Sequence, residues 1–310
     1  MIAEKKYIKA QSVEDAIAAA MESTGSFTYI AGGTDVVVNK FQGNIQADCL
    51  IDITGIDELK HVTTEDNLLR IGALVTLDDL KKHPVIADNF PALLEAAHSV
   101  ASPLIRKTAT IGGNILCENR CSFYNQSEWW REAVGYCLKC DGDICIATGG
   151  KNACFSKLVS DTAPLLISCN AQIEIADKHG NSVLNLEDIY SGDGVKPVTL
   201  SKTALITSIL LPLGKSYKCV FKKLRPRESV DFSSLTTSIS LSSEKTIRIV
   251  VASVDPKPIL VEGKVSDDRE SLILKAFKKC RVVDNDIYSR EYRREMIKVF
   301  LTQSFDELGL

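Results

Sequence analysis

The stretch FTYIAGGTDVVVNK, residues 27–40, places a glycine turn between two apolar runs. The β-branched and aromatic residues up to Ala31 predict a strand, and GGTD at 32–35 predicts a turn. A strand that ends in a Gly-rich turn exposes backbone N–H groups, and such a loop favours an anion, most simply a phosphate. Because a Gly-Gly pair is more often only a turn, this stretch by itself is a weak indication of a phosphate site.

Two further motifs extend this interpretation. TIGGN, residues 110–114, is a second glycine turn behind a β-branched run, and SDTAP, residues 160–164, has the polar start of a short helix. The two glycine turns could bind two parts of one extended ligand. Asp161 in the third motif also has a simpler interpretation, as a helix N-terminal acid that the helix dipole stabilises.

The order of elements predicts an α+β fold. Strand-like and helix-like segments alternate without a long βαβ series, which favours separate α+β units over one doubly wound sheet. Ser12 predicts the N-cap of a first helix, and Pro84 and Pro91 predict interruptions of a helical stretch. The final unit closes with a helical stretch over 268–308.

Composition and charge exclude several classes of function. The chain has 310 residues, 45% of them hydrophobic, and a net charge of -3, as in an ordinary globular protein. Lysine and arginine are scattered, so no basic field for nucleic acid is expected. No apolar run resembles a signal peptide or reaches the length of a membrane span. We therefore expect a cytoplasmic protein that binds neither nucleic acid nor membrane.

Six of the ten cysteines lie in one segment, CENRCSFYNQSEWWREAVGYCLKCDGDICIATGGKNAC, residues 117–154. In a reducing compartment, clustered thiols indicate metal binding or redox work. Spacing alone leaves an iron–sulfur cluster and structural zinc equally open, because Cys137 and Cys140 form a C-x-x-C pair. The other cysteines lie singly in apolar surroundings typical of inert buried thiols: Cys49, Cys169, Cys219 and Cys280.

The three motifs AGGTD, TIGGN and SDTAP, in this order, resemble those of the FAD-binding subunit of the molybdenum hydroxylase family, which includes xanthine dehydrogenase and carbon monoxide dehydrogenase. RIVVASVDPKPILVEG and YSREYRREMI resemble the C-terminal domain of that subunit. The resemblance implies a two-part FAD-binding domain of the PCMH type and a small α+β C-terminal domain. The expected boundaries are 1–58, 59–214 and 215–310.

The resemblance also implies an FAD site. The first glycine turn would wrap the FAD pyrophosphate, the second would lie against the flavin and its phosphates, and Asp161 would accept a hydrogen bond from a ribose hydroxyl. Ile206 and Lys222 match positions near the adenine and isoalloxazine, although Lys222 is also typical of a solvated strand charge. The implied FAD-binding residues are Ala31, Gly32, Gly33, Thr34, Asp35, Val36, Thr110, Gly112, Gly113, Asn114, Asp161, Ile206 and Lys222.

The sequence departs from most of this family between Asn114 and Ser160, which have 45 residues between them. This long insertion resembles that of the 4-hydroxybenzoyl-CoA reductase β subunit, whose FAD domain carries a loop with a 4Fe-4S cluster. The resemblance places the loop at 116–156 and leaves Cys117 and Cys140 spare. It implies a ligand set of Cys121, Cys137, Cys145 and Cys154. Aromatic residues of the insertion could shield the cluster from water.

The function implied by this resemblance is that of an electron-transfer oxidoreductase subunit without catalytic residues of its own. Its partners would be a 2Fe-2S small subunit and a molybdopterin large subunit, in a dimer of heterotrimers. Electrons would pass from ferredoxin or a similar low-potential donor toward molybdenum, for reductive dehydroxylation of a phenolic substrate. The alternative is a xanthine, aldehyde or carbon monoxide dehydrogenase-type complex in which electrons leave molybdenum for NAD or another acceptor.

Two other classes of protein remain open at this point. One is a stand-alone or NAD-linked flavoprotein whose insertion holds zinc or no metal. The other is an assembly or scaffold subunit that has lost its flavin, although the presence of both glycine turns and of Asp161 argues against it.

Overall fold

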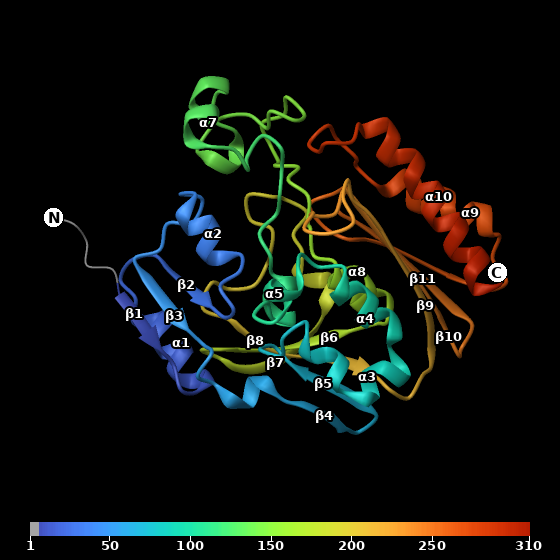
Figure 1. Cartoon of the computed structure of the whole chain (residues 1–310), viewed down its shortest axis with the longest axis horizontal. Helices are drawn as coiled ribbons and strands as arrows, with labels where there is room; N and C mark the ends of the chain where they lie inside the picture. Colours follow the sequence, from blue (N-terminus) through green and yellow to red (C-terminus); the bar gives the residue numbers. More distant parts are fainter. Residues whose placement is uncertain (1–5) are drawn as a thin grey trace.

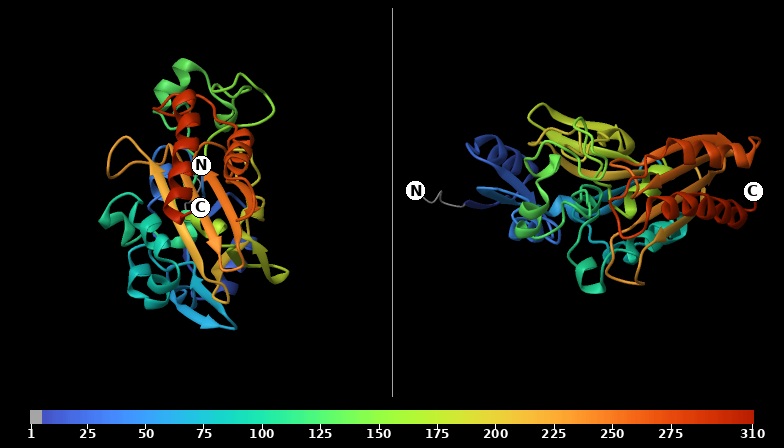
Figure 2. Two further views of the ribbon diagram at one scale, coloured as in Figure 1. Left: turned by 90° about the vertical axis from the view of Figure 1, so that its right-hand side faces the viewer. Right: turned by 90° about the horizontal axis from the view of Figure 1, so that it is seen from above.

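A computed structural model describes residues 6–310, so the first five residues of the predicted 1–58 unit lie outside it. The described chain forms three β-sheets that lie in a row along the long axis, each with its own helices (Figures 1 and 2). This mixture of helices and sheets confirms the predicted α+β class. Within the described residues, every helix is too short or too polar to cross a bilayer.

The first sheet is parallel, with the strand order β1-β3-β2. Its strands are β1 (Lys6–Lys9), β2 (Phe27–Ile30) and β3 (Cys49–Asp52), and its helices are α1 (Val13–Glu22) and α2 (Val36–Phe41). The hydroxyl of Ser12 accepts the N–H of Asp15 at 3.1 Å, which confirms the predicted N-cap of α1. Strand β2 ends at the first glycine turn, as predicted, and α2 begins directly after the turn.

The second sheet is antiparallel, with the order β4-β5-β8-β6-β7. Its strands are β4 (Val62–Glu65), β5 (Leu68–Gly72), β6 (Gln172–Asp177), β7 (Gly180–Asn185) and β8 (Leu205–Pro212). The helices of this unit are α3 (Pro84–Asn89), α4 (Pro91–His98), α5 (Pro103–Arg106), α6 (Ile111–Ile115) and α8 (Thr162–Ser168). Pro84 and Pro91 each stand at the first position of a helix, where the missing N–H costs nothing. The predicted interruptions are confirmed.

The third sheet is antiparallel, with the order β12-β11-β10-β9, and is covered on both faces. Its strands are β9 (Tyr217–Leu224), β10 (Leu235–Ser242), β11 (Thr246–Ala252) and β12 (Ile259–Lys264), and its helices are α9 (Arg269–Lys279) and α10 (Arg290–Leu308). The single closing helical stretch expected over 268–308 is wrong, because residues 280–289 separate two helices. A new N-cap ends the break: Ser289 accepts the N–H of Tyr292 at 3.2 Å.

The cysteine-rich insertion leaves the second unit through a closed neck. Arg120 and Lys157 exchange two backbone hydrogen bonds, of 2.9 and 2.8 Å, so the loop begins and ends at one place. It contains one α-helix, α7 (Glu128–Val134), and a short 3-10 helix at Leu138–Cys140, and it lies between the first and third units (Figure 1). Arg131 donates to the Asn44 side chain at 2.7 Å on one side, and on the other the Ser122 N–H donates to the Asn285 carbonyl at 3.1 Å.

Three large clusters of buried side chains correspond to the three sheets. The predicted boundaries after residues 58 and 214 fall close to the changes from one cluster to the next. Leu59, Leu74 and Leu205 pack into the first cluster although they lie beyond residue 58. The division at 1–58, 59–214 and 215–310 stays a prediction that these cores support.

Candidate functional site

The two glycine turns lie against each other, backbone to backbone. A Cβ atom on Gly32 would stand 1.7 Å from the carbonyl oxygen of Thr108, just before the TIGGN motif. Gly33 has a φ of +70°, in the left-handed region that favours glycine, and its carbonyl accepts the Val37 N–H at 2.9 Å. Because Gly32 has no side chain, the first turn can approach the Thr108 carbonyl this closely. The same segment carries three more predicted contacts, namely Ala31, Thr34 and Val36.

The two turns differ in how their backbone N–H groups are used. Across residues 6–310, no protein acceptor is hydrogen-bonded to the N–H groups of 32–35. In the second turn the Gly112 N–H donates to the Ala73 carbonyl at 3.0 Å, and the Gly113 N–H to the Thr110 hydroxyl at 3.1 Å. The first turn therefore keeps donors for an anion, and the second offers the exposed, side-chain-free surface of Gly113.

Asn114 joins the second glycine turn to the SDTAP motif. Its side-chain oxygen accepts from the Ser160 hydroxyl at 2.9 Å and from the Thr162 hydroxyl at 2.7 Å. The two motifs are thus in contact despite the 45 residues between Asn114 and Ser160. The structure brings all three motifs together and leaves the insertion outside them.

Asp161 lies directly before α8, but its side chain does not cap that helix. It is buried, and its two oxygens accept from the Lys223 ammonium at 2.6 Å and from the Ser233 hydroxyl. Burial raises the pKa of the Asp161 carboxyl, and the Lys223 charge opposes that rise. Burial likewise lowers the pKa of Lys223, against the effect of Asp161. A ribose hydroxyl would therefore have to share a carboxylate that already accepts from two protein donors.

The remaining two predicted FAD contacts, Ile206 and Lys222, lie on β8 and β9. Ile206, on β8, is buried in the large central core. Lys222, on β9, pairs with Glu307 of α10 at 2.6 Å, on the far face of the third sheet from α8. Its neighbour Lys223 reaches Asp161 instead, because successive side chains of a strand point to opposite faces. The sequence analysis missed Lys223. Alternation along β9 puts Lys222 and Lys223 on opposite faces, but only the folded structure shows which elements cover each face.

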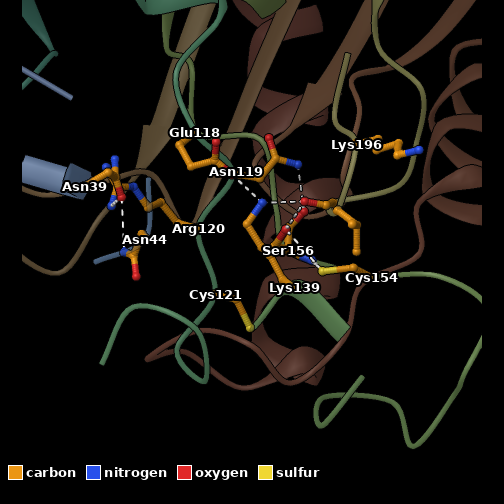
Figure 3. A network of polar contacts seen from close by, with 12 residues as sticks. Asn39, Asn44, Glu118, Asn119, Arg120, Cys121, Lys139, Cys154, Ser156 and Lys196 are labelled. Carbon is orange, nitrogen blue, oxygen red and sulfur yellow. Dashed lines mark hydrogen bonds and ion pairs between the residues drawn. The ribbon is translucent and has the colours of Figure 1, made fainter. Parts of the chain in front are cut away.

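Asp35 connects the first glycine turn to the insertion. Its carboxylate accepts the Glu118 N–H at 2.9 Å and forms an ion pair with Arg120, at the neck of the insertion. Asn39 of α2 also donates to it, at 3.1 Å. Figure 3 shows Arg120 turned toward Asn39. The neck of the cysteine loop is therefore anchored to the predicted phosphate turn.

The insertion surrounds a small cavity of about 10 Å³. Its lining includes the whole predicted ligand set, Cys121, Cys137, Cys145 and Cys154, and all four are buried. The two cysteines left spare are absent from the lining. Cys117 follows α6, where its N–H donates to the Asn114 carbonyl at 3.3 Å, and Cys140 packs against the small apolar cluster of Cys121, Tyr124 and Cys137. The other lining residues are Phe123, Tyr124, Leu138, Ile146, Ala147 and Ser156.

Backbone donors face three of these sulfurs. Burial raises the pKa of the Cys121 thiol to about 11, and the N–H groups of Phe123 and Tyr124 oppose that rise. Burial also raises the pKa of Cys137 and of Cys154, against hydrogen bonds from the residues two positions later. The N–H of Ser156 donates to the Cys154 sulfur at 3.4 Å. These donors favour an anionic sulfur, as a metal-bound thiolate is.

A distant loop, residues 191–194, holds Cys154 in place. The Cys154 N–H donates to the Asp193 carboxylate, and the Gly194 N–H donates to the Cys154 carbonyl, both at 2.9 Å. A Cβ atom on Gly194 would lie 2.0 Å from the Ser156 hydroxyl oxygen and 2.9 Å from the Cys154 sulfur. The sequence analysis did not identify this loop, and its only local signal is the turn composition SGDG.

The four cysteines surround a space and do not converge on a point. In the part of the chain that the structure describes, no three His, Cys, Asp or Glu side chains lie close enough to hold one metal ion. Among the remaining cysteines, Cys169 and Cys219 are in contact, with their sulfurs 3.4 Å apart in the core. The arrangement can therefore provide four thiolates around a shared volume, but no preformed single-ion site of the zinc type.

Comparisons with known proteins indicate an FAD-binding domain. Residues 3–214 match the family described as the FAD binding domain in molybdopterin dehydrogenase. The aldehyde oxidoreductase FAD-binding subunit PaoB of Escherichia coli (strain K12) is 28% identical over 245 residues, 76% of this chain and 77% of that protein. The nicotinate dehydrogenase FAD-subunit of Eubacterium barkeri is 26% identical over 206 residues, 66% of this chain and 57% of that protein.

The fold is likewise that of a solved structure. Carbon monoxide dehydrogenase from Hydrogenophaga pseudoflava, in a form that lacks the Mo-pyranopterin moiety, superposes with a TM-score of 0.77 at 20% identity. The superposition covers 99% of this chain and 98% of that one, so it includes all three sheets.

Proposed function

This chain belongs to the FAD-binding subunits of the molybdenum hydroxylase family, and on that premise we propose that it also holds a 4Fe-4S cluster and transfers electrons between the two cofactors. Bound FAD exchanges one or two electrons and a bound cluster exchanges one at a time, so a chain with both converts between the two kinds of carrier. The chain itself would bind, orient and shield the two groups. No catalytic residue is proposed in it.

The chemistry of the glycine turns supports the FAD part of the proposal. The N–H groups of 32–35 have no protein acceptor among the described residues, and a pyrophosphate would supply one. Gly113 is exposed and has no side chain to keep a flat ring system away. Asp161 and Lys223 would hold α8 and β9 together beside this site.

The observation that carries the cluster proposal is the shared cavity of Cys121, Cys137, Cys145 and Cys154. In a 4Fe-4S cluster each thiolate binds a different iron, so the sulfurs stand around a volume and not around one ion. The cavity wall is otherwise apolar, apart from the Tyr124 and Ser156 hydroxyls, and an apolar wall limits the access of water to a cluster. Phe123 and Tyr124 are the aromatic residues that take this shielding position.

For the whole complex we propose a 4-hydroxybenzoyl-CoA reductase-like role, which rests on the resemblance of the insertion to the cluster loop of that β subunit. The partners would be a 2Fe-2S small subunit and a molybdopterin large subunit, in a dimer of heterotrimers in the cytoplasm. Ferredoxin or a similar donor would supply electrons for reductive dehydroxylation of a phenolic substrate. The substrate site would lie in the large subunit.

The second candidate function is favoured by the names of the relatives, which are dehydrogenases and an aldehyde oxidoreductase. In a complex of that type, electrons would leave molybdenum and pass through this chain to NAD or another acceptor. Both candidates use the same two cofactor sites in this chain, so only the direction of transfer and the large subunit distinguish them.

Metal and flavin analysis of the anaerobically purified chain tests the proposal. We expect about four iron atoms and about four acid-labile sulfides beside one FAD. One zinc or no metal, with FAD bound, would contradict the cluster and support a flavoprotein of the general family type. Iron without flavin would contradict the assignment of the glycine turns.

The direction of transfer is tested by purifying the complex and identifying its large subunit. We expect reduced ferredoxin to reduce the flavin and a phenolic thioester to reoxidise the complex. Rapid flavin reduction by an aldehyde or a purine, followed by transfer to NAD, would instead support the dehydrogenase-type alternative.

A further inference from the structure

Lys139 is a buried cation inside the insertion, and neither cofactor site assigned above accounts for it. Its side chain is 5% exposed, in a loop that is otherwise largely on the surface. Lysine is rarely buried unless its charge is paired, because removing an ammonium from water is costly. Its ammonium pairs with the Glu118 carboxylate, donates to the Gly194 carbonyl and lies 5.1 Å from the centre of the Tyr124 ring.

The contacts with Tyr124 and Gly194 place the charge beside the cysteine cavity. Tyr124 belongs to the cavity lining, and Leu138, the residue before Lys139, does so as well. Gly194 packs on Cys154, since a Cβ atom there would lie 2.9 Å from the sulfur. Figure 3 shows Lys139 reaching between Glu118 on one side and Ser156 with Cys154 on the other.

Glu118 holds the other end of this ion pair, toward the glycine turn. Its backbone N–H donates to Asp35 at 2.9 Å, so its position is fixed from the FAD side. Its side chain is 25% exposed, which leaves the buried ammonium as the less screened of the two charges. The pair therefore presents a positive end to the cysteine cavity and a negative end to the neck of the insertion.

We propose that Lys139 is a positioning residue that raises the reduction potential of the cluster held by the four cysteines, and that Glu118 moderates this effect. The proposal rests on the proposed function, because it requires the cluster. Reduction adds an electron to a group that four thiolates already make negative, so a nearby buried cation stabilises the reduced state more than the oxidised one. Removal of the Lys139 charge should therefore lower the reduction potential, and removal of the Glu118 charge should raise it.

The test compares Lys139→Met, Glu118→Gln and the double variant with the parent chain, by potentiometric titration followed by electron paramagnetic resonance of the reduced cluster. At the parent midpoint, we expect the ratio of reduced to oxidised cluster to fall about tenfold in K139M, which corresponds to about 59 mV for one electron. We expect that ratio to rise in E118Q and to lie close to the parent value in the double variant. Opposite signs distinguish a charge effect from a loss of structure.

Lys151→Met is the matched control, because Lys151 is an exposed lysine of the same insertion, three residues before Cys154. We expect its midpoint to equal that of the parent chain, since solvent screens the charge. Lys139→Arg, which keeps the charge, should stay close to the parent value. Flavin content and unfolding midpoints of every variant report on the fold.

The outcomes distinguish a failure of this inference from a failure of the proposed function. Absence of iron in the parent chain overturns both. Iron in the parent chain with unchanged potentials in K139M and E118Q overturns the role of Lys139 and leaves the proposed function standing. If K139M cannot retain iron, E118Q decides the question, and a midpoint that does not rise in E118Q overturns the inference.

Discussion

The glycine-turn site and the cysteine cavity differ in whether main chain or side chains form them. The first is made of main chain, with N–H groups of 32–35 and the bare surface of Gly113 between two well-packed units. The second is made of side chains on an irregular loop, backed by a small apolar cluster around Cys121, Tyr124 and Cys137. A site made of main chain between large cores is formed before its ligand binds. We expect a site made of thiols with so small a core to depend on a bound group for its order.

The largest expected effect concerns the thiols. Replacing Cys121, Cys137, Cys145 or Cys154 with Ser removes one ligand, and we expect the cluster to be lost while FAD is retained. Iron content and flavin absorption of each variant measure this. Cys117→Ser and Cys140→Ser serve as controls, because neither side chain lines the cavity. Loss of iron in either control with retention in one of the four variants would show that the ligand set is different.

The next effect concerns the buried ion pair beside the glycine turns. Lys223→Met leaves the Asp161 carboxylate buried without its cation, which should lower the free energy of unfolding by about 3–5 kcal/mol. Lys222→Met is the control one residue away, because its partner Glu307 is 54% exposed and such pairs contribute about 0–1 kcal/mol. Urea unfolding measures both. Equal losses of unfolding free energy in the two variants would contradict the difference in burial between the two ion pairs.

A smaller effect is expected at the contact between the two glycine turns. Gly32→Ala puts a Cβ atom 1.7 Å from the Thr108 carbonyl oxygen, and backbone must shift to relieve it, at a cost of about 1–3 kcal/mol. The shift separates the turns, so the FAD content should fall as well. Gly214→Ala is the control, since a Cβ atom there meets only Asn67, at 3.9 Å. Full FAD content in G32A would show that the flavin does not use this contact.

The smallest effect is expected at the loop that holds Cys154. Gly194→Ala brings a Cβ atom to 2.0 Å from the Ser156 hydroxyl oxygen, but a serine side chain can rotate away more easily than backbone can move. We expect a partial loss of iron with unchanged FAD, measured as the iron-to-flavin ratio. Gly150→Ala, within the insertion, should retain the parent ratio, because its Cβ atom would meet only the Thr148 hydroxyl, at 3.3 Å. A fall in FAD in G194A would contradict the separation of the two sites.

Elements with local causes could be predicted from the sequence. The strand before the first glycine turn, the Ser12 cap and the two helices that begin at prolines each depend on residues within one or two turns of chain. The closing helix was predicted as one element because the break at 280–289 contains no proline or glycine. The contact of Lys223 with Asp161 was not predicted for a similar reason, since strand alternation separates the two faces of β9 but does not say which face is covered by α8.

By itself the sequence determined the order of the three motifs, the α+β class and the thiol-rich insertion, because each is a property of neighbouring residues. The tertiary structure alone decided which groups meet. It joined Asn114 to Ser160 across the insertion, brought the 191–194 loop onto Cys154 and set Lys139 between Glu118 and the cavity. These contacts join residues that are tens of positions apart, and packing of the three cores decides them. No periodicity along the chain encodes such contacts, so they appear only when the chain is folded.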